Sequence, residues 1–313
     1  MKVAVTSKAF AKDPALVAYL AANFPDYRLN NATRKLTDAE LVEFLHDADA
    51  VILALEQLNA SVLAQLPQLK VVAKFGVGLD NIDFAACAAR QIPVLHQAGV
   101  NRQAVAELSL CMALMLLRNI YVTANLLSGG TWLKQGGHSL FGKTVGIIGF
   151  GHVGTALAAL LQPFGCEILV HDIVDKTAEC QALGARQVPL GTVLTTSAVL
   201  SLHCPLTDLT AGMVDADFLA AMPRGAILIN TARGELVDLT ALEAALRAGT
   251  IAGAALDVYD PEPPVQHALL AMPNLIPTPH IGGNSKEATE AMGKSAIDLL
   301  LAYARNPTSV SRV

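Results

Sequence analysis

Short apolar runs alternate along the chain with longer segments in which apolar residues recur at helical spacing. This alternation predicts strands and helices in turn, as in parallel α/β sheets. In the first third of the chain, strands are predicted near Lys2–Thr6, Tyr27–Leu29, Ala50–Ala54, Val71–Phe75 and Ile92–Leu95. Further along, strands are predicted near Thr144–Ile148, Glu167–His171, Ala198–His203, Ala226–Asn230, Gly253–Asp257 and Leu275–Pro277. The predicted fold class is therefore α/β, with two parallel-sheet units.

Local signals mark several helices. Capping boxes at Thr37–Glu40 and Thr240–Glu243 predict helix starts, and Gly249 predicts the end of the second of these helices. The charge-free apolar segment Leu108–Leu117 predicts a buried helix, because it is too short to span a bilayer, which needs about 20 residues. The last segment, Asn284–Val313, has a helical apolar pattern and is expected to pack back on the first unit.

These elements divide the chain into two predicted domains. The first comprises residues 1–98 plus 284–313, and the second comprises residues 99–283. The total of 313 residues fits two domains of roughly 150 residues each. A hydrophobic content of 53% is enough for two cores.

Charge and cysteine usage exclude several classes of protein. The net charge is −5 and no run of Lys or Arg occurs, so we expect no nucleic-acid partner. The cysteines are odd in number and scattered, which favours reduced thiols in a cytoplasmic protein over a disulfide framework. The N-terminal Met1–Thr6 is typical of a strand and not of a signal peptide. We also expect no membrane partner and no metal site.

A glycine fingerprint follows one predicted strand. The sequence GFGHVG, from Gly149 to Gly154, lies between the strand Thr144–Ile148 and a helical segment. Gly149 permits a tight turn, Gly151 lets the backbone approach a pyrophosphate, and Gly154 lets the helix pack on the strand. The helix N-terminus adds N–H groups and a positive dipole end, so this segment predicts a dinucleotide site.

An acidic residue indicates which dinucleotide is bound. Asp172 ends the strand that follows the fingerprint, at about the 20-residue spacing typical of the residue that binds the adenine ribose hydroxyls. A carboxylate there repels a 2′-phosphate, and residues 173–175 offer no arginine to receive one. NAD is therefore predicted in preference to NADP.

Three further residue types could support hydride transfer between a nicotinamide and a small 2-hydroxy acid. Arg233 lies in the loop after a predicted strand, and its planar guanidinium can bind a carboxylate through two hydrogen bonds. His280 can take up and return the hydroxyl proton near neutral pH. A carboxylate from Asp260 or Glu262 could pair with the second ring nitrogen of that histidine, and their spacing does not separate the two.

With these motifs, the chain resembles the NAD-dependent D-2-hydroxyacid dehydrogenase family, and within it the phosphoglycerate dehydrogenase branch. The match runs from about Leu69 to Ala288 and is poor over the first 60 residues. The matching stretches are Lys74–Asp83, Gly146–Gly154, Leu202–Leu206, Asn230–Asp238, Gly253–Pro264 and Pro279–His280. The resemblance implies two Rossmann-like domains, with the active site in the cleft between a substrate-binding domain and an NAD-binding domain.

The resemblance also implies the roles of individual residues. Arg233, Glu262 and His280 match the family's catalytic arginine, glutamate and histidine, which selects Glu262 over Asp260. Asp257 matches the acid that holds the nicotinamide amide, and the other cofactor contacts match Gly149, Gly151, His152, Val153, Gly154, Asp172, Cys204, Pro205, Thr210, Thr231 and Ala232. The resemblance assigns substrate binding to Arg233 and the backbone of Val77 and Gly78. Lys74, at a strand end of the first domain, is a further predicted substrate-binding residue by its position. Members of the family usually form homodimers through the nucleotide domain, using a segment that here includes Leu108–Trp132.

The substrate is less well defined than the chemistry. Relatives that act on phosphoglycerate hold the phosphate with basic residues, but Glu56 lies where an arginine is expected after the third strand. Lys8 and Lys74 remain as possible anion partners in the first domain, and His96 lies in a crossover that departs from the family. The sequence therefore predicts an NAD-dependent D-2-hydroxyacid dehydrogenase, a 2-oxo acid reductase. D-3-phosphoglycerate dehydrogenase is one alternative, and an NAD(H)-sensing protein or a vestigial nucleotide domain are others.

Overall fold

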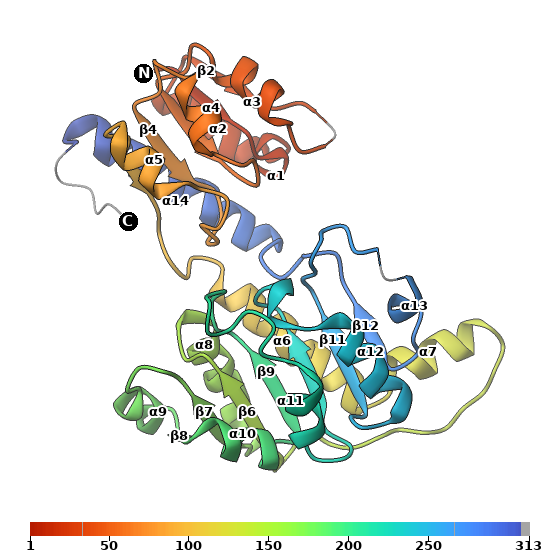
Figure 1. Ribbon diagram of the computed structural model, residues 1–313. Coiled ribbons are helices and arrows are strands. Elements are labelled where there is room, and N and C mark those ends of the chain that lie inside the picture. The colour runs from red at the N-terminus through yellow and green to blue at the C-terminus, as the bar shows by residue number, and fades with distance from the viewer. Residues whose placement is uncertain (33, 266, 308–313) are drawn as a thin grey trace. The chain divides into compact units, whose positions relative to one another are not determined.

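The computed structural model describes residues 1–32, 34–265 and 267–307. The chain divides into two compact units, each drawn in Figure 1. Unit 1 contains residues 1–101 and the chain from Gly283 onward, and unit 2 contains Arg102–Gly282. Of the predicted C-terminal segment, residues 308–313 lie outside the described part of the chain.

Unit 1 is built on a parallel sheet with the strand order β2-β1-β3-β4-β5. Its strands are β1 Val3–Val5, β2 Tyr27–Leu29, β3 Ala50–Leu53, β4 Val71–Lys74 and β5 Val94–Leu95. Its helices are α1 Lys8–Ala11, α2 Pro14–Asn23, α3 Asp38–Leu45, α4 Ala60–Ala64, α5 Phe84–Ala89 and α14 Lys286–Arg305. Buried side chains of α1, α2 and α14 cover one face of the sheet, and those of α3, α4 and α5 cover the other.

Unit 2 is built on a larger parallel sheet with the strand order β12-β11-β10-β9-β6-β7-β8. Its strands are β6 Thr144–Ile148, β7 Glu167–His171, β8 Ala185–Gln187, β9 Val199–Leu202, β10 Ile227–Asn230, β11 Gly253–Leu256 and β12 Leu275–Pro277. Its α-helices are α6 Arg102–Leu117, α7 Ile120–Ser128, α8 His152–Leu161, α9 Thr177–Ala182, α10 Leu190–Thr196, α11 Ala216–Ala221, α12 Leu239–Ala248 and α13 His267–Leu270. Helices α6, α8 and α9 pack on one face, and α10 to α13 pack on the other.

The two-sheet α/β fold predicted from the alternating pattern is confirmed, and every predicted strand is present with ends shifted by two residues or fewer. Two local predictions need correction. Strand β8 was not predicted, and it forms an edge strand paired with β7. Helix α12 begins at Leu239 and not after Thr240, because the Asp238 side chain accepts hydrogen bonds from the backbone nitrogens of Thr240 and Ala241.

Other local predictions hold. The capping box of α3 is formed, with Thr37 bound to the Glu40 nitrogen and Glu40 bound to the Thr37 nitrogen. Gly249 ends α12 in the left-handed region. Helix α14 packs on unit 1, where the absence of a side chain at Gly293 leaves room for Leu16 of α2.

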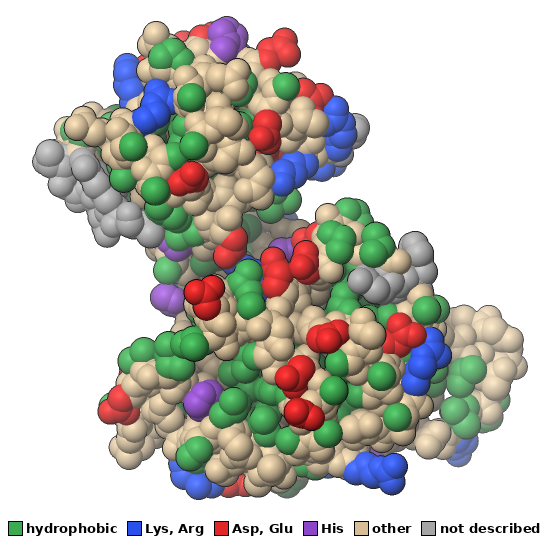
Figure 2. Space-filling model, in the orientation of Figure 1, with side chains coloured by type: hydrophobic (Ala, Val, Ile, Leu, Met, Phe, Trp, Pro, Cys, Tyr) green, Lys and Arg blue, Asp and Glu red, His purple; other side chains and the backbone are tan. Residues whose placement is uncertain are grey.

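Charged side chains are distributed unevenly on one face of unit 2. On the face that Figure 2 shows, Asp and Glu side chains are spread across unit 2, and Lys and Arg lie mostly at its periphery. Within the described ranges, no single helix is long and apolar enough to cross a membrane. Helices α6 and α7 meet that test only together, and they are bent by 66° at the break between them.

Candidate active site

The glycine fingerprint forms the turn between β6 and α8. Gly149 has a φ of 92°, and a Cβ atom there would lie 2.5 Å from the backbone nitrogen of Cys204, so the turn requires glycine. A Cβ atom at Gly154 would lie 2.2 Å from the Gly149 carbonyl oxygen, so the first turn of α8 packs directly on this turn. Gly151 caps α8 and faces open space, which leaves room for a phosphate at the helix N-terminus.

Asp172 is bound to the same turn. Its Oδ2 accepts a hydrogen bond from the backbone nitrogen of Phe150 at 2.6 Å, and its Oδ1 accepts one from Val174 at 2.9 Å. Each carboxylate oxygen has a further lone pair, so the group can still accept from the ribose hydroxyls. The acidic group and the glycine turn therefore fit an NAD-type dinucleotide.

The loop after β9 carries three of the predicted cofactor residues. The Thr210 hydroxyl donates to the carbonyl oxygen of Pro205 at 2.7 Å, which closes the loop on itself. Cys204 is buried, and burial raises the pKa of its thiol to about 11. Burial therefore favours the neutral thiol at neutral pH.

The loop that carries Arg233 is held by the last residue of β10. The buried Asn230 side chain accepts from the backbone nitrogen of Ala232 at 3.0 Å and donates to the carbonyl oxygen of Arg233 at 2.7 Å. Nη1 of Arg233 donates to the carbonyl oxygen of Ala232 at 2.7 Å. The guanidinium is thus presented by a closed loop at the carboxyl end of β10.

Gly234 joins this loop to the one that carries Glu262. A Cβ atom at Gly234 would lie 2.1 Å from the carbonyl carbon of Tyr259 and 2.6 Å from the nitrogen of Asp260. Only glycine permits this approach, because each of these atoms belongs to the backbone. The loops after β10 and β11 are therefore in direct contact.

His280 and Glu262 form a hydrogen-bonded pair within unit 2. Nδ1 of His280 lies 3.0 Å from Oε1 and 2.8 Å from Oε2 of Glu262, and Oε1 also accepts from the Tyr259 nitrogen at 3.1 Å. Since a carboxylate can only accept, Nδ1 carries the proton and the carboxylate sets the tautomer. Both side chains are about half exposed.

The contact between His280 and Glu262 shifts the pKa of both residues. The hydrogen bond to Glu262 raises the pKa of His280 above its ordinary value, although partial burial and the Arg233 charge oppose the rise. Burial acts to raise the pKa of Glu262, but the contact with His280, the Tyr259 N–H and the Arg233 charge outweigh it, and the pKa is lowered. The arrangement favours an imidazolium beside a carboxylate, as an acid catalyst requires.

Asp257 lies under the segment that carries His280. This buried carboxylate accepts from the Thr278 hydroxyl at 2.6 Å, from the Ile281 nitrogen at 2.8 Å and from the Gly282 nitrogen at 2.7 Å. The resemblance assigned it only to the nicotinamide amide, and no local sequence signal indicated these bonds. His280 itself has a φ of 54°, a left-handed conformation that the surrounding bonds hold.

The first unit holds the remaining predicted substrate residues. Nζ of the buried Lys74 donates to the Ala54 carbonyl oxygen and, at 2.7 Å, to Oδ1 of Asn81. Glu56 is 3% exposed, and its Oε2 has no hydrogen-bond partner among the described residues. His96 Nε2 lies 3.1 Å from the Val77 carbonyl oxygen, so it donates to the loop that contains Gly78.

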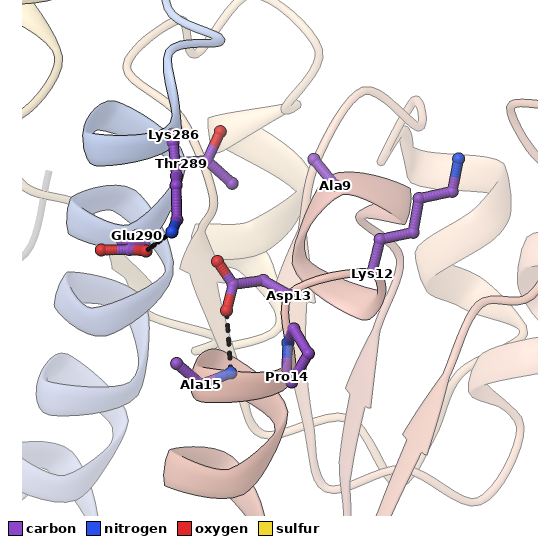
Figure 3. A pocket seen from close by; sticks show the side chains of 8 residues that line it. All are labelled: Ala9, Lys12, Asp13, Pro14, Ala15, Lys286, Thr289 and Glu290. Atoms are coloured by element: carbon purple, nitrogen blue, oxygen red, sulfur yellow. Dashed lines mark hydrogen bonds and ion pairs between the residues drawn. The ribbon is translucent and has the colours of Figure 1, made fainter.

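A surface depression lies apart from these residues. Unit 1 has a shallow depression between α1, α2 and α14 (Figure 3), lined by Ala9, Lys12, Asp13, Pro14, Ala15, Lys286, Thr289 and Glu290. Its lining includes none of the predicted site residues, and Asp13 caps α2 there. In the described part of the chain, no group of three or more His, Cys, Asp or Glu is arranged to hold a metal ion.

Comparison with known proteins agrees with this geometry. The sequence model described as "D-isomer specific 2-hydroxyacid dehydrogenase, NAD binding domain" matches residues 110–282. Glyoxylate reductase of Thermococcus litoralis is 37% identical over 275 residues, which cover 85% of this chain and 83% of the relative. D-3-phosphoglycerate dehydrogenase of Mycobacterium leprae is 35% identical over 81% of this chain and 49% of the relative. The crystal structure of D-lactate dehydrogenase with NAD⁺ from Lactobacillus jensenii superposes with a TM-score of 0.81 at 29% identity, covering 97% of each chain.

Proposed function

The chain belongs to the D-isomer-specific 2-hydroxyacid dehydrogenase family, as an NAD-dependent oxidoreductase, and we propose that it reduces a small unphosphorylated 2-oxo acid such as glyoxylate. The observation that carries the proposal is the pair formed by His280 Nδ1 and the Glu262 carboxylate. This pair provides an acid whose pKa is raised toward the working pH.

In the proposed reaction, residues of unit 2 bind the substrate carboxylate and transfer the proton. Arg233 binds the substrate carboxylate and orients the neighbouring carbonyl. The nicotinamide of NADH, when bound, supplies the hydride that adds to C2. Nδ1 of His280 is occupied by Glu262, so Nε2 donates the proton to the carbonyl oxygen, and Glu262 stabilises the imidazolium before transfer. In the reverse direction, His280 takes the hydroxyl proton from the 2-hydroxy acid.

The cofactor assignments form part of the proposal. The N-terminal turn of α8, with Gly151, His152 and Val153, binds the pyrophosphate, and Asp172 binds the adenine ribose. Further contacts come from Cys204, Pro205, Thr210, Thr231, Ala232 and Asp257. The backbone of Val77 and Gly78 provides N–H groups for the substrate carboxylate. The predicted division into a substrate-binding and an NAD-binding domain stays a prediction, as does an active site between them.

The choice of an unphosphorylated substrate rests on unit 1. A phosphate needs a cationic partner, and Lys74 is buried with hydrogen bonds to Ala54 and Asn81. The nearby loop contains the buried acidic Glu56 and not an arginine. These features favour glyoxylate-type acids over 3-phosphohydroxypyruvate, the 2-oxo acid whose reduction gives D-3-phosphoglycerate. The comparisons with dehydrogenases also favour an enzyme over an NAD(H)-sensing protein.

The experiment is an assay of NADH oxidation against a panel of 2-oxo acids. The panel contains glyoxylate, hydroxypyruvate, pyruvate, 2-oxoglutarate and 3-phosphohydroxypyruvate. The proposal expects the highest kcat/KM with glyoxylate or hydroxypyruvate. A preference for 3-phosphohydroxypyruvate would overturn the substrate assignment. Tight NADH binding with no turnover of any acid would contradict the proposed reaction itself.

The protein is also proposed to form a homodimer through unit 2. What supports this is a set of exposed apolar side chains on α7 and the segment after it, namely Ile120, Leu127, Trp132, Leu133 and Phe141. In Figure 1, α7 and this segment extend from the side of the unit 2 sheet. Light scattering should give twice the chain mass of 32.8 kDa, and a monomer would contradict the proposal. A cytoplasmic location remains a prediction from the cysteine pattern.

A further inference from the structure

We infer that Ser109, in the middle of α6, is a positioning residue for Arg233. The Ser109 hydroxyl lies 2.9 Å from the Thr231 hydroxyl, and Thr231 begins the loop that presents the guanidinium. Both side chains are buried, Ser109 at 1% and Thr231 at 9% exposure. The inference rests on the proposed role of Arg233 in binding the substrate carboxylate.

The direction of these hydrogen bonds follows from the partners. Ser109 Oγ lies 2.8 Å from the Val105 carbonyl oxygen, which can only accept, so the single Ser109 proton is donated there. The hydroxyl of Thr231 must then donate to Ser109 Oγ. These two hydrogen bonds fix the χ1 angle of Thr231 and attach the loop to α6, a helix that carries no proposed catalytic residue. Removal of the Ser109 hydroxyl leaves the buried Thr231 hydroxyl without this acceptor, and removal of the Thr231 hydroxyl leaves Ser109 bonded only to the Val105 carbonyl oxygen.

A second set of bonds transmits this position to Arg233. The Asn230 side chain bridges the Ala232 nitrogen and the Arg233 carbonyl oxygen, so the loop from Asn230 to Arg233 is internally rigid. The Asn230 side chain bonds only to the backbone of this loop, whereas the Ser109 hydroxyl connects the loop to α6. A shift at Thr231 therefore moves the loop as one body and displaces the guanidinium.

The same turn of α6 also supports the histidine segment. A Cβ atom at Gly282 would lie 3.6 Å from the side chains of both Val105 and Leu108, so this end of the His280 segment packs on α6. The residues Val105–Ser109 thus contact both segments that carry proposed catalytic groups. Helix α6 in turn packs on α8, the helix of the glycine fingerprint, within one hydrophobic core. The helix is the common support against which Arg233 and His280 are placed.

The chain provides a matched control. Ser128 of α7 makes the same bond to the carbonyl oxygen four residues earlier, that of Ala124, at 3.0 Å, but it is exposed and contacts no catalytic loop. Serine in this helical arrangement is close to neutral by itself. Ser128→Ala therefore removes only the local helix bond, whereas Ser109→Ala also removes the bond to Thr231.

The test compares Ser109→Ala, the isosteric Thr231→Val, the double variant and Ser128→Ala in the full-length protein. Oxalate binding to the NADH complex, followed by NADH fluorescence, reports the carboxylate site without requiring turnover. We expect Ser109→Ala and Thr231→Val each to weaken oxalate binding about fivefold or more. In Ser109→Ala, which changes no proposed cofactor contact, the NADH Kd should stay within about twofold of wild type. The double variant should lose less than the product of the two single effects. Ser128→Ala should match wild type.

Ser109→Thr separates the hydroxyl from general packing, because threonine can make the same bond to the carbonyl four residues earlier. It should recover oxalate affinity even where its Tm falls through the added methyl group. Unchanged oxalate binding in Ser109→Ala, with or without a lower Tm, would overturn the inference, as would an equal loss of NADH affinity. Failure of the wild type to reduce any 2-oxo acid would instead contradict the proposed function, and the oxalate measurement would still decide the role of Ser109.

Discussion

Oδ2 of Asp257 accepts a hydrogen bond from the backbone nitrogen of Gly282 at 2.7 Å, across 25 residues of sequence. The other carboxylate oxygen binds Thr278 and Ile281, so one buried group holds both sides of His280. The left-handed conformation of the histidine is thereby stabilised from the neighbouring strand β11. We therefore expect Asp257 to act on the proposed reaction through the placement of His280.

Asp257→Asn tests this placement. An asparagine offers one acceptor oxygen and an NH₂ group, so at least one of the three donors would face another donor in a buried site. We expect the free energy of unfolding to fall by about 1–3 kcal/mol and kcat to fall with it. Chemical denaturation and steady-state kinetics measure both. Unchanged kcat in a destabilised variant would restrict Asp257 to a role in folding.

His280→Ala removes the proposed acid–base group. We expect kcat for 2-oxo acid reduction to fall by about 10²–10⁴, the usual contribution of such a group. NADH binding should be unaffected, because the fingerprint and Asp172 lie on other elements. His138→Ala, at an exposed histidine of the same unit, is the control and should retain full activity. Turnover near wild type in His280→Ala would rule out the assignment.

Glu262→Gln tests the electrostatic role of the pair. The hydrogen bond to Glu262 raises the pKa of His280, and reduction needs the protonated ring. Wild-type reduction should therefore persist as the pH rises above the ordinary imidazole pKa of about 6.5, and fall only when the pH passes the raised value. In Glu262→Gln this falling limb should move to lower pH, as should the rising limb of the reverse oxidation. Profiles of kcat/KM against pH that coincide for the two proteins would contradict this account.

Gly234→Ala tests the contact between the two catalytic loops. The added Cβ atom would lie 2.1 Å from the Tyr259 carbonyl carbon, so the loop with Arg233 must move away from the loop with Glu262. Overpacking of this kind costs about 1–3 kcal/mol, and we expect kcat/KM for the 2-oxo acid to fall at least tenfold. Gly191→Ala is the matched control, since a Cβ atom there meets nothing within 4 Å and the residue lies in α10. Equal activity of the two variants would show that the close approach is not needed.

Asp172→Asn tests cofactor choice. The charged acceptor becomes a neutral amide, and hydrogen bonds to charged groups contribute about 1.5–3 kcal/mol. We expect kcat/KM with NADH to fall about tenfold or more, while activity with NADPH, whose 2′-phosphate the carboxylate repels, falls less or rises. The ratio of the two values in each protein measures the effect. A ratio that stays at the wild-type value would place the ribose elsewhere.

Sequence reasoning reached the strands and the glycine turn because these depend on local signals. Arg233 and His280 were candidates from residue type and position, whereas Glu262 was selected over Asp260 only by the resemblance to the family. Buried parallel strands are continuous apolar runs, and a capping residue acts within one helical turn. The edge strand β8 escaped prediction because Ala185–Gln187 contains one buried residue and no apolar run. At the start of α12, Asp238 and Thr240 compete as caps two residues apart, and the residue pattern does not decide between them.

The residue pattern predicts all the strands except β8, the cofactor class and the residue types available for the chemistry. The contacts between distant residues come from the packed fold: Asp257 with Gly282, Gly234 with the backbone of Tyr259, Ser109 with Thr231, and Lys74 with Asn81. Hydrogen bonds and close contacts between distant segments depend on how the strands and helices pack. Periodicity and capping report the environment of a residue, whereas its partner is set by the packed fold.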